Sequence, residues 1–219
     1  MRFRNRADAG RALASALSSY KSQNPIVLAL PRGGVPVAAE VAEQLAAPLD
    51  IILVRKIGAP IQPELALGAV VDGGRPIIVR NPDVIRLTGT TESQFQAICD
   101  EELAEIERRR RLFLGSRQPL NPEGRVAIVI DDGIATGATM RAALLVTRMR
   151  NPKKLVLAVP VAAPSTLEEL RPEVDDIVCL ASTEHFEAVG YFYADFRQLT
   201  DEDVSEILAR VSAGQTAET

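Results

Sequence analysis

The sequence predicts an α/β fold, a doubly wound and mainly parallel sheet flanked by helices. Several short apolar runs have no polar face, as strands covered on both sides of a parallel sheet do, and amphipathic helical patterns separate these runs. The chain has 219 residues, of which 47% are hydrophobic, which suffices for one domain with a full core. We therefore expect a single domain over residues 1–219, with its ligand at the carboxyl ends of the strands.

The first part of the chain predicts a parallel βαβ unit behind an N-terminal helix. The expected elements are a helix over residues 7–20, a strand over 26–30, a helix over 35–46 and a strand over 49–54. Strand, helix and strand in this order place the two strands parallel in one sheet. The tight loop Pro31-Arg32-Gly33-Gly34 joins the first strand to its helix.

The middle of the chain predicts an insertion over residues 57–120, between the second and third core strands. The expected elements are a polar loop over 55–65, hairpin strands over 66–71 and 77–80, and a long helix over 91–113. Asp72-Gly73-Gly74 supplies the hairpin turn. Thr91, with Gln94 three residues later, predicts a capping box at the start of the long helix.

The last part of the chain predicts three further strands and a C-terminal helix. The expected elements are a strand over residues 126–130, a helix that reaches residue 150, a strand over 155–161, a short helix, a strand over 177–180 and a tail over 188–213. We expect Ser165 with Glu168 to cap the short helix, and Thr200 to cap the helix within the tail.

Composition argues against several classes of protein. The net charge of −4 is unlike that of a general nucleic-acid coat. Cys99 and Cys179 fall in different elements without a CxxC pair, so we expect neither a disulfide nor a zinc site. The N-terminus lacks the apolar segment of a signal peptide, and no apolar run approaches the roughly 20 residues of a membrane span. We therefore expect a cytoplasmic protein with no membrane partner.

The stretch from Val126 to Met140 carries the main functional signal. An apolar strand stops at two adjacent carboxylates, Asp131 and Asp132, and a loop of glycine and hydroxyl residues then opens a helix. The first N–H groups of a helix are unpaired and carry the positive end of its dipole, so this loop is an anion site by geometry. Because carboxylates accept hydrogen bonds from sugar hydroxyls, the stretch predicts a ligand with a phosphate and a polyol.

This stretch resembles the phosphoribosyl-pyrophosphate (PRPP) binding motif of type I phosphoribosyltransferases. The matching residues are, in order, Asp131, Asp132, Gly133, Ile134, Ala135, Thr136, Gly137, Ala138 and Thr139. The resemblance implies that the two acids bind the ribose hydroxyls and hold Mg²⁺ through water. It also implies that residues Ala135 to Thr139 bind the 5-phosphate. We call the loop from Gly133 to Thr139 the signature loop.

Other interpretations of the stretch fit less well. A Walker A loop needs a lysine where Ala138 stands, and a dinucleotide fingerprint needs three spaced glycines where only Gly133 and Gly137 are present. An ordinary strand-to-helix turn is the remaining alternative.

A second glycine loop is expected at the same edge of the sheet. The resemblance implies that Arg32, Gly33 and Gly34 bind pyrophosphate. Glycine allows the backbone to approach a ligand closely, and Arg32 supplies a forked cation. The alternative is a tight turn with a surface arginine.

Two basic residues are expected to end the second core strand at this edge. The resemblance implies that Arg55 and Lys56 contact the diphosphate as catalytic cations. It also implies that residues 57–71 form a flexible lid, which would keep water from an oxocarbenium-like transition state. The alternative for the two cations is solubility at a strand end.

The segment over residues 184–213 is expected to form a hood and a C-terminal helix. By resemblance the hood covers the acceptor, and the residues expected to line that site are Val189, Tyr191, Phe192, Tyr193 and Asp195. The alternative is hydrophobic cover over the sheet end. Three departures argue against a 6-oxopurine acceptor. Asp195 lies one residue later than in those enzymes, their lysine before the hood is missing, and Ala135 replaces an acid in the signature loop.

The sequence as a whole most resembles bacterial phosphoribosyltransferases whose acceptor is unassigned. It predicts Mg²⁺-dependent transfer of 5-phosphoribosyl from PRPP to a nitrogen acceptor such as a nucleobase, with release of pyrophosphate, in a homodimer. The alternative is a non-enzymatic PRPP sensor or RNA-binding regulator on the same fold. A PRPP synthase-like activity would need a second, similar domain, and the chain has no repeat. We interpret the run from Arg108 to Arg111 as a solvated helix face rather than a nucleic-acid contact.

Overall fold

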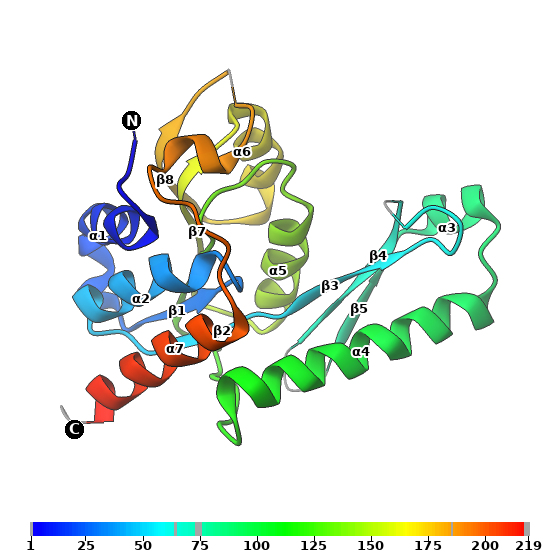
Figure 1. The fold of residues 1–219 in the computed structure, drawn as a ribbon, viewed down its shortest axis with the longest axis horizontal. Helices are drawn as coiled ribbons and strands as arrows, with labels where there is room; N and C mark the ends of the chain where they lie inside the picture. Colours follow the sequence, from blue (N-terminus) through cyan, green and yellow to red (C-terminus); the bar gives the residue numbers. More distant parts are fainter. Residues whose placement is uncertain (1, 64, 73–75, 185, 217–219) are drawn as a thin grey trace.

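The protein consists of a core and an arm that extends from it (Figure 1). The computed structural model describes residues 2–63, 65–72, 76–184 and 186–216. Within this part of the chain, no helix has the length and apolar character needed to cross a membrane.

Five parallel strands form the core sheet, which confirms the predicted fold class. In spatial order they are β2 (Leu49–Ile51), β1 (Pro25–Ala29), β6 (Val126–Ile130), β7 (Lys154–Ala162) and β8 (Asp176–Ser182). β1 and β6 are neighbours, with Ala29 opposite Ile130. The strand order reverses between them, and such a switch point opens a crevice at the carboxyl ends of the strands.

Helices cover both faces of this sheet (Figure 1). One face carries α1 (Arg6–Ala16), the 3₁₀ turn η1 (Ser18–Gln23), α2 (Gly34–Leu45) and α7 (Asp201–Thr216), and the other carries α5 (Ala138–Met149) and α6 (Pro164–Leu170). Alternate residues of β6 enter the two halves of the core, so that Ile128 packs on the α2 side and Val129 on the α5 side. This two-sided burial explains why the strand has no polar face.

The arm lies between β2 and β6 in the sequence and consists of an antiparallel sheet and two helices (Figure 1). Its elements are β3 (Val54–Gly58), β4 (Ala66–Val71), β5 (Ile77–Arg80), α3 (Pro82–Thr88) and α4 (Glu92–Leu114). Phe95 of α4 is buried under the Arg80 guanidinium, whose carbon lies 4.2 Å from the ring centroid. Arg80 also donates two hydrogen bonds to Glu92, at 2.6 and 2.8 Å.

Several predictions for the arm and the tail are confirmed. The hairpin strands pair as expected, although their turn includes residues 73–75, outside the described part of the chain. Thr91 and Gln94 form the predicted capping box of α4. Thr200 caps α7, because its hydroxyl accepts a hydrogen bond from the Asp203 backbone N–H at 3.1 Å.

The predicted strand over residues 49–54 is wrong, because it merges two strands. β2 ends at Ile51, the chain leaves the core sheet, and Val54 begins β3 opposite Val71 of β4. The predicted polar loop over 55–65 therefore begins as a paired strand. An apolar run reports that a segment is buried, but not which sheet buries it.

Two helix predictions also need correction. Helix α3 was not expected, and its start is capped by Asn81, whose side chain accepts from the Val84 N–H at 3.3 Å. The predicted cap by Ser165 and Glu168 is wrong, because α6 begins at Pro164 with no side-chain cap. A proline suits the first helical position, because its φ is already helical and its missing N–H would have had no partner within the helix.

Buried polar contacts fasten the arm to the core. Asp50 of β2 is 3% exposed and accepts hydrogen bonds from the Leu120 N–H at 2.7 Å and from Arg117 at 3.2 Å. At the start of the hairpin turn, Asp72 pairs with Arg110 of α4, and its carbonyl accepts from Arg150 at 2.8 Å. The arm therefore meets the core at a fixed place near β2 and the end of α5.

Candidate functional site

The loops that follow β1 and β6 lie side by side at the switch point. The Leu30 N–H donates to the Ile130 carbonyl at 2.9 Å, which extends the pairing of the two strands by one residue. Beyond this hydrogen bond, Arg32 and Gly33 follow β1, and Asp131 and Asp132 follow β6. The sequence-predicted glycine loop and acid pair are therefore neighbours in space.

Glycine is required in the first loop because the end of β6 comes so close. A Cβ atom on Gly33 would overlap the Asp132 carboxylate. On Gly34 it would lie 2.7 Å from the Ile130 carbonyl oxygen and 2.9 Å from the Asp131 Cα. Both positions exclude every residue with a side chain unless the acid pair moves. The Pro31–Arg32 peptide bond between them and β1 is cis.

The signature loop after β6 forms a concave surface at the start of α5. Gly137 is the N-cap of this helix and has a φ of 74°, a value that favours glycine. The loop is fixed from outside, because the Thr166 hydroxyl donates to the Ala135 carbonyl at 2.6 Å and the Ile134 N–H to the Val161 carbonyl at 3.0 Å. A cavity of about 190 Å³ is lined by Asp131, Gly133, Ile134, Ala135, Thr136, Gly137, Ala138, Thr139, Met140 and Val189.

The acid pair is largely withdrawn from water. The Asp132 N–H donates to Asp131 Oδ1 at 2.8 Å, and Arg6 Nε donates to Asp132 Oδ2 at 2.7 Å. Burial, and then the neighbouring Asp132 charge, raise the pKa of Asp131 well above its ordinary value. Burial also raises the pKa of Asp132, although the ion pair with Arg6 acts in the opposite direction. Arg6 therefore offsets part of the cost of burying negative charge on the pair.

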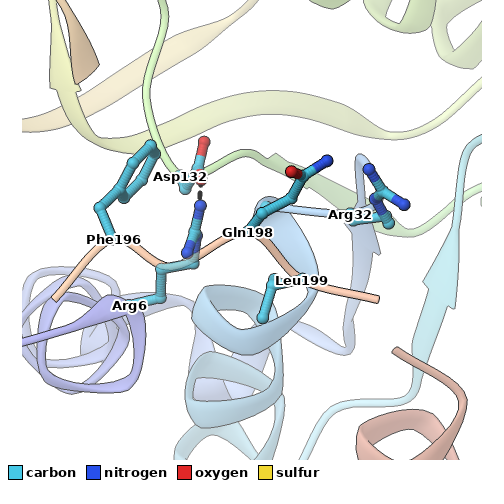
Figure 2. Close-up of a pocket in the computed structure, with 7 residues that line it drawn as sticks. Arg6, Arg32, Asp132, Phe196, Gln198 and Leu199 are labelled. Carbon is cyan, nitrogen blue, oxygen red and sulfur yellow. Dashed lines mark hydrogen bonds and ion pairs between the residues drawn. The ribbon is translucent and has the colours of Figure 1, made fainter. Parts of the chain in front are cut away.

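A second cavity, of about 350 Å³, opens beside Asp132 (Figure 2). It is lined by Arg6, Arg32, Gly33, Asp132, Phe196, Gln198 and Leu199. Arg32 lies on the side of the cavity away from Arg6, and its Nη1 is 3.5 Å from Oδ1 of Asp201 at the start of α7. The cavity joins the glycine loop, the acid pair and the tail of the chain in one space.

Sequence reasoning assigned no site role to Arg6, Phe196 or Gln198. A signal for Arg6 does exist, because it shares the stripe of α1 that carries Ala9 and Leu13, both fully buried. A cation on the buried face of an amphipathic helix indicates a buried partner. Nothing local marks Gln198, whose position depends on how the tail folds back.

Arg55 and Lys56 do not end a core strand, as the sequence predicted, but lie inside β3 on opposite faces. Arg55 Nε pairs with Glu102 of α4 at 2.6 Å. Lys56 instead lines a cavity of about 360 Å³ between the arm and the signature loop, together with Thr136 and Thr139. The alternation of side chains along a strand separates these neighbours, so only Lys56 faces the loop.

The aromatic tail is placed differently from the predicted hood. Tyr193 is buried, and its hydroxyl donates to the Asp132 carbonyl at 2.6 Å, so it supports the acid pair from behind. Val189 lies against the signature loop and lines its cavity. Phe192 stacks on Phe186, with ring centroids 5.4 Å apart.

Two other residues of the predicted hood are not part of the cavity beside Asp132. Tyr191 is 69% exposed, and neither it nor Asp195, which is also exposed, lines that cavity. Phe196 is the aromatic residue of the tail that does so.

Protein carboxylates alone do not build a metal cage at this site. Across the described ranges, no group of three or more histidine, cysteine, aspartate or glutamate side chains is placed so that it could hold a metal ion. Asp131 and Asp132 could supply oxygen ligands to a cation that takes its other ligands from a substrate and from water, which is how Mg²⁺ usually binds.

The chain belongs to the phosphoribosyl transferase family. The sequence profile described as "Phosphoribosyl transferase domain" matches residues 3–197. Among individual proteins, the chain is 44% identical over 208 residues to "Putative phosphoribosyl transferase Rv0571c" of Mycobacterium tuberculosis, a match that covers 95% of this chain and 46% of that protein. The chain therefore spans about half the length of the curated relatives that it matches.

A solved structure matches the whole fold. The protein TT1426 from Thermus thermophilus is 43% identical in sequence, with a TM-score of 0.80. The match covers 96% of this chain and 99% of that one. The family resemblance inferred from the signature stretch is thus confirmed.

The raised pKa of Asp131 predicts a pH-dependent cost of folding. The folded chain keeps a proton on Asp131 that the unfolded chain releases above the ordinary value of 3.8, so the contribution of Asp131 to wild-type stability falls as the pH rises toward the raised pKa. Asp131→Asn cannot lose a proton. We expect the free energy of unfolding of this variant to increase relative to wild type from about pH 5 to about pH 8.

Urea unfolding in EDTA-containing buffer measures this difference at each pH. Asp100→Asn, at an exposed position on α4, serves as the control and should follow wild type. A difference between Asp131→Asn and wild type that stays constant across the range would contradict the assignment.

Proposed function

We propose that the protein is an enzyme that transfers the 5-phosphoribosyl group of PRPP to a nitrogen acceptor. The observation that supports this most is the acid pair at the end of β6, placed between a helix-start anion loop and a glycine loop, in a chain of the phosphoribosyl transferase family. Each of these parts matches one part of PRPP. The reaction breaks the bond from ribose C1 to the pyrophosphate oxygen and forms a bond from C1 to nitrogen. Pyrophosphate leaves with the electron pair, and the acceptor loses a proton.

In this proposal Asp131 and Asp132 accept hydrogen bonds from the ribose 2- and 3-hydroxyls. Thr136, Gly137, Ala138 and Thr139 bind the 5-phosphate through the unpaired N–H groups of the α5 start and through hydroxyls. The Arg32 to Gly34 loop stabilises the pyrophosphate as negative charge develops on it. Positioning and electrostatics then carry the reaction, and no covalent nucleophile is needed.

Mg²⁺ belongs to the proposal as a partner of the substrate. Bound Mg²⁺ would neutralise part of the diphosphate charge and favour its departure. Asp131 and Asp132 would hold it through water, and their oxygen donors suit a hard cation.

Residues 57–71 remain the proposed lid, although residues 57–58 belong to β3 and residues 66–71 form β4. β3 and β4 pair on either side of residues 59–65, and Ala66 and Gly68 of β4 line the cavity beside the signature loop. Movement of the arm as a unit, rather than of a loose loop, would then exclude water from the transition state. The homodimer and the cytoplasmic location also stay predictions.

The alternative of an RNA-binding regulator gains little support from the arginine run on α4. Arg108 and Arg109 both pair with Glu105, and Arg111 pairs with Glu107. Arg110 turns inward to Asp72. Cations that already have carboxylate partners make a weak phosphate-binding surface.

Substitution of the acid pair tests the proposed PRPP site. Asp131→Asn together with Asp132→Asn should weaken PRPP binding about 100-fold or more, because neutral amides accept hydrogen bonds from the ribose hydroxyls less strongly than the acid pair does. Isothermal titration calorimetry with PRPP and Mg²⁺ measures the affinity. The matched control, Asp100→Asn with Glu101→Gln, changes two adjacent exposed acids of α4 and should leave the affinity unchanged. Equal affinities for both double variants would refute the proposal.

The neighbouring cations of β3 give a second test. Lys56→Met should lower kcat/KM for pyrophosphate release about tenfold or more, because this side chain faces the signature loop. Arg55→Met should lower it far less, since Arg55 pairs with Glu102 on the opposite face. A coupled pyrophosphate-release assay with PRPP and a panel of nucleobases provides the rates. The proposal for Lys56 is wrong if Arg55→Met is the more damaging change.

A further inference from the structure

Arg6 occupies a central position between three parts of the site. Its Nε donates to Asp132 Oδ2 at 2.7 Å, and a terminal nitrogen donates to the Arg197 carbonyl at 3.0 Å. The guanidinium carbon lies 3.9 Å from the centroid of the Phe196 ring. The side chain is only 11% exposed, yet it lines the cavity beside Asp132. A single residue of α1 thus connects the acid pair, the tail and the cavity.

Arg6 ends a series of ring contacts, of which the Phe3–Tyr193 pair is tilted and the Tyr193–Phe196 pair is stacked. The rings of Phe3 and Tyr193 lie 5.7 Å apart, those of Tyr193 and Phe196 lie 5.0 Å apart, and the Arg6 guanidinium covers Phe196. Figure 2 shows Arg6 between Phe196 and Gln198, with Asp132 at its edge. Of these groups, Arg6 and Phe196 line the cavity, and the Arg6 guanidinium covers the Phe196 ring.

This arrangement changes which residue can stack on an acceptor. Tyr193 is buried and Phe196 is already covered by Arg6, so neither offers a free ring face to the cavity. Tyr191 does not line the cavity. Arg32, which the proposed function assigns to pyrophosphate, lies at the other end of this cavity (Figure 2). A planar acceptor at the end away from Arg32 would meet the Arg6 guanidinium.

We propose that Arg6 is the acceptor-binding and specificity-determining residue, on which a planar, electron-rich nitrogen heterocycle stacks. This inference rests on the proposed phosphoribosyl transfer and names its class of acceptor. Gln198, across the cavity, is placed to pair with polar groups at the ring edge, because an amide both donates and accepts hydrogen bonds. Neutral or anionic rings fit, whereas ammonia and alkylamines do not.

The physical basis is the chemistry of the guanidinium group. It is planar, delocalised and weakly hydrated, so it stacks on π systems, and it attracts an electron-rich face. The hydrogen bonds to Asp132 and to the Arg197 carbonyl fix the plane before an acceptor arrives, which reduces the entropy lost on binding. Because Arg6 also contacts Asp132, a ring stacked on Arg6 would lie next to the proposed ribose site. A cavity of about 350 Å³ lies in the range of small-ligand sites.

Arg6→Lys separates stacking from charge, since lysine keeps a cation near Asp132 but has no planar group. The acceptor probes are adenine, hypoxanthine, orotate and nicotinate, with ammonia and ethylamine as non-planar amines. We expect wild type to use or bind at least one of the planar rings. Arg6→Lys should raise the KM of that ring about tenfold, with a smaller effect on kcat and with the Kd of PRPP changed by no more than about twofold.

Two further variants complete the design. Arg11→Lys is the matched control, because Arg11 lies on the same helix, is exposed and pairs with Asp8 and Glu40 away from the cavity. It should behave as wild type. Gln198→Ala, at an exposed position, should weaken the same ring about threefold without affecting the fold. It provides the readout if Arg6→Lys does not fold, as judged by circular dichroism.

The outcomes separate this inference from the proposed function. If wild type does not bind PRPP by calorimetry, the phosphoribosyl transfer itself fails. If PRPP binds but only ammonia or ethylamine reacts, or no planar ring binds by saturation-transfer NMR, Arg6 is not a stacking residue. Equal KM values for wild type and Arg6→Lys, or an equal loss of PRPP and acceptor binding, would also overturn the inference.

Discussion

The close approach of the glycine loop after β1 to the carboxyl end of β6 is the constraint on which the rest of the site depends. Gly33 and Gly34 touch the acid pair with no space for a Cβ atom. This contact exists because β1 and β6 are neighbours in the core sheet, and the strand order reverses between them. A five-stranded sheet with another order would place the same two loops on separate crevices.

Electrostatics adds a second constraint, which acts through Arg6. Burial opposes the ionisation of both carboxyls, and the Asp132 charge further opposes that of Asp131. Arg6 offsets this cost at Asp132, and Tyr193 supports the same residue through its carbonyl. The N-terminal helix and the tail are therefore parts of the site, because Arg6 and Tyr193 each contact Asp132 directly.

The parts predicted well from the sequence are those whose signals are contiguous. The stretch from Val126 to Met140 contains strand, acids, loop and helix start in one run, so fold class, ligand edge and family followed from it. The capping box of α4 was equally local.

The predictions that failed depended on partners distant in sequence. β3 was merged with β2 because an apolar run cannot say which sheet it joins, and Arg55 was grouped with Lys56 because adjacency hides the two faces of a strand. Arg6 and Asp132 are 126 positions apart.

The central claim is that the glycine loop and the acid pair act as one PRPP site, and calorimetry of a single variant tests it most directly. A methyl group in Gly33→Ala would displace the Asp132 carboxylate, so PRPP affinity in the presence of Mg²⁺ should fall about tenfold or more. Gly214→Ala, which meets open space, should bind PRPP as wild type does. If Gly33→Ala folds and binds PRPP with wild-type affinity, the two loops do not share a ligand, and the account is contradicted.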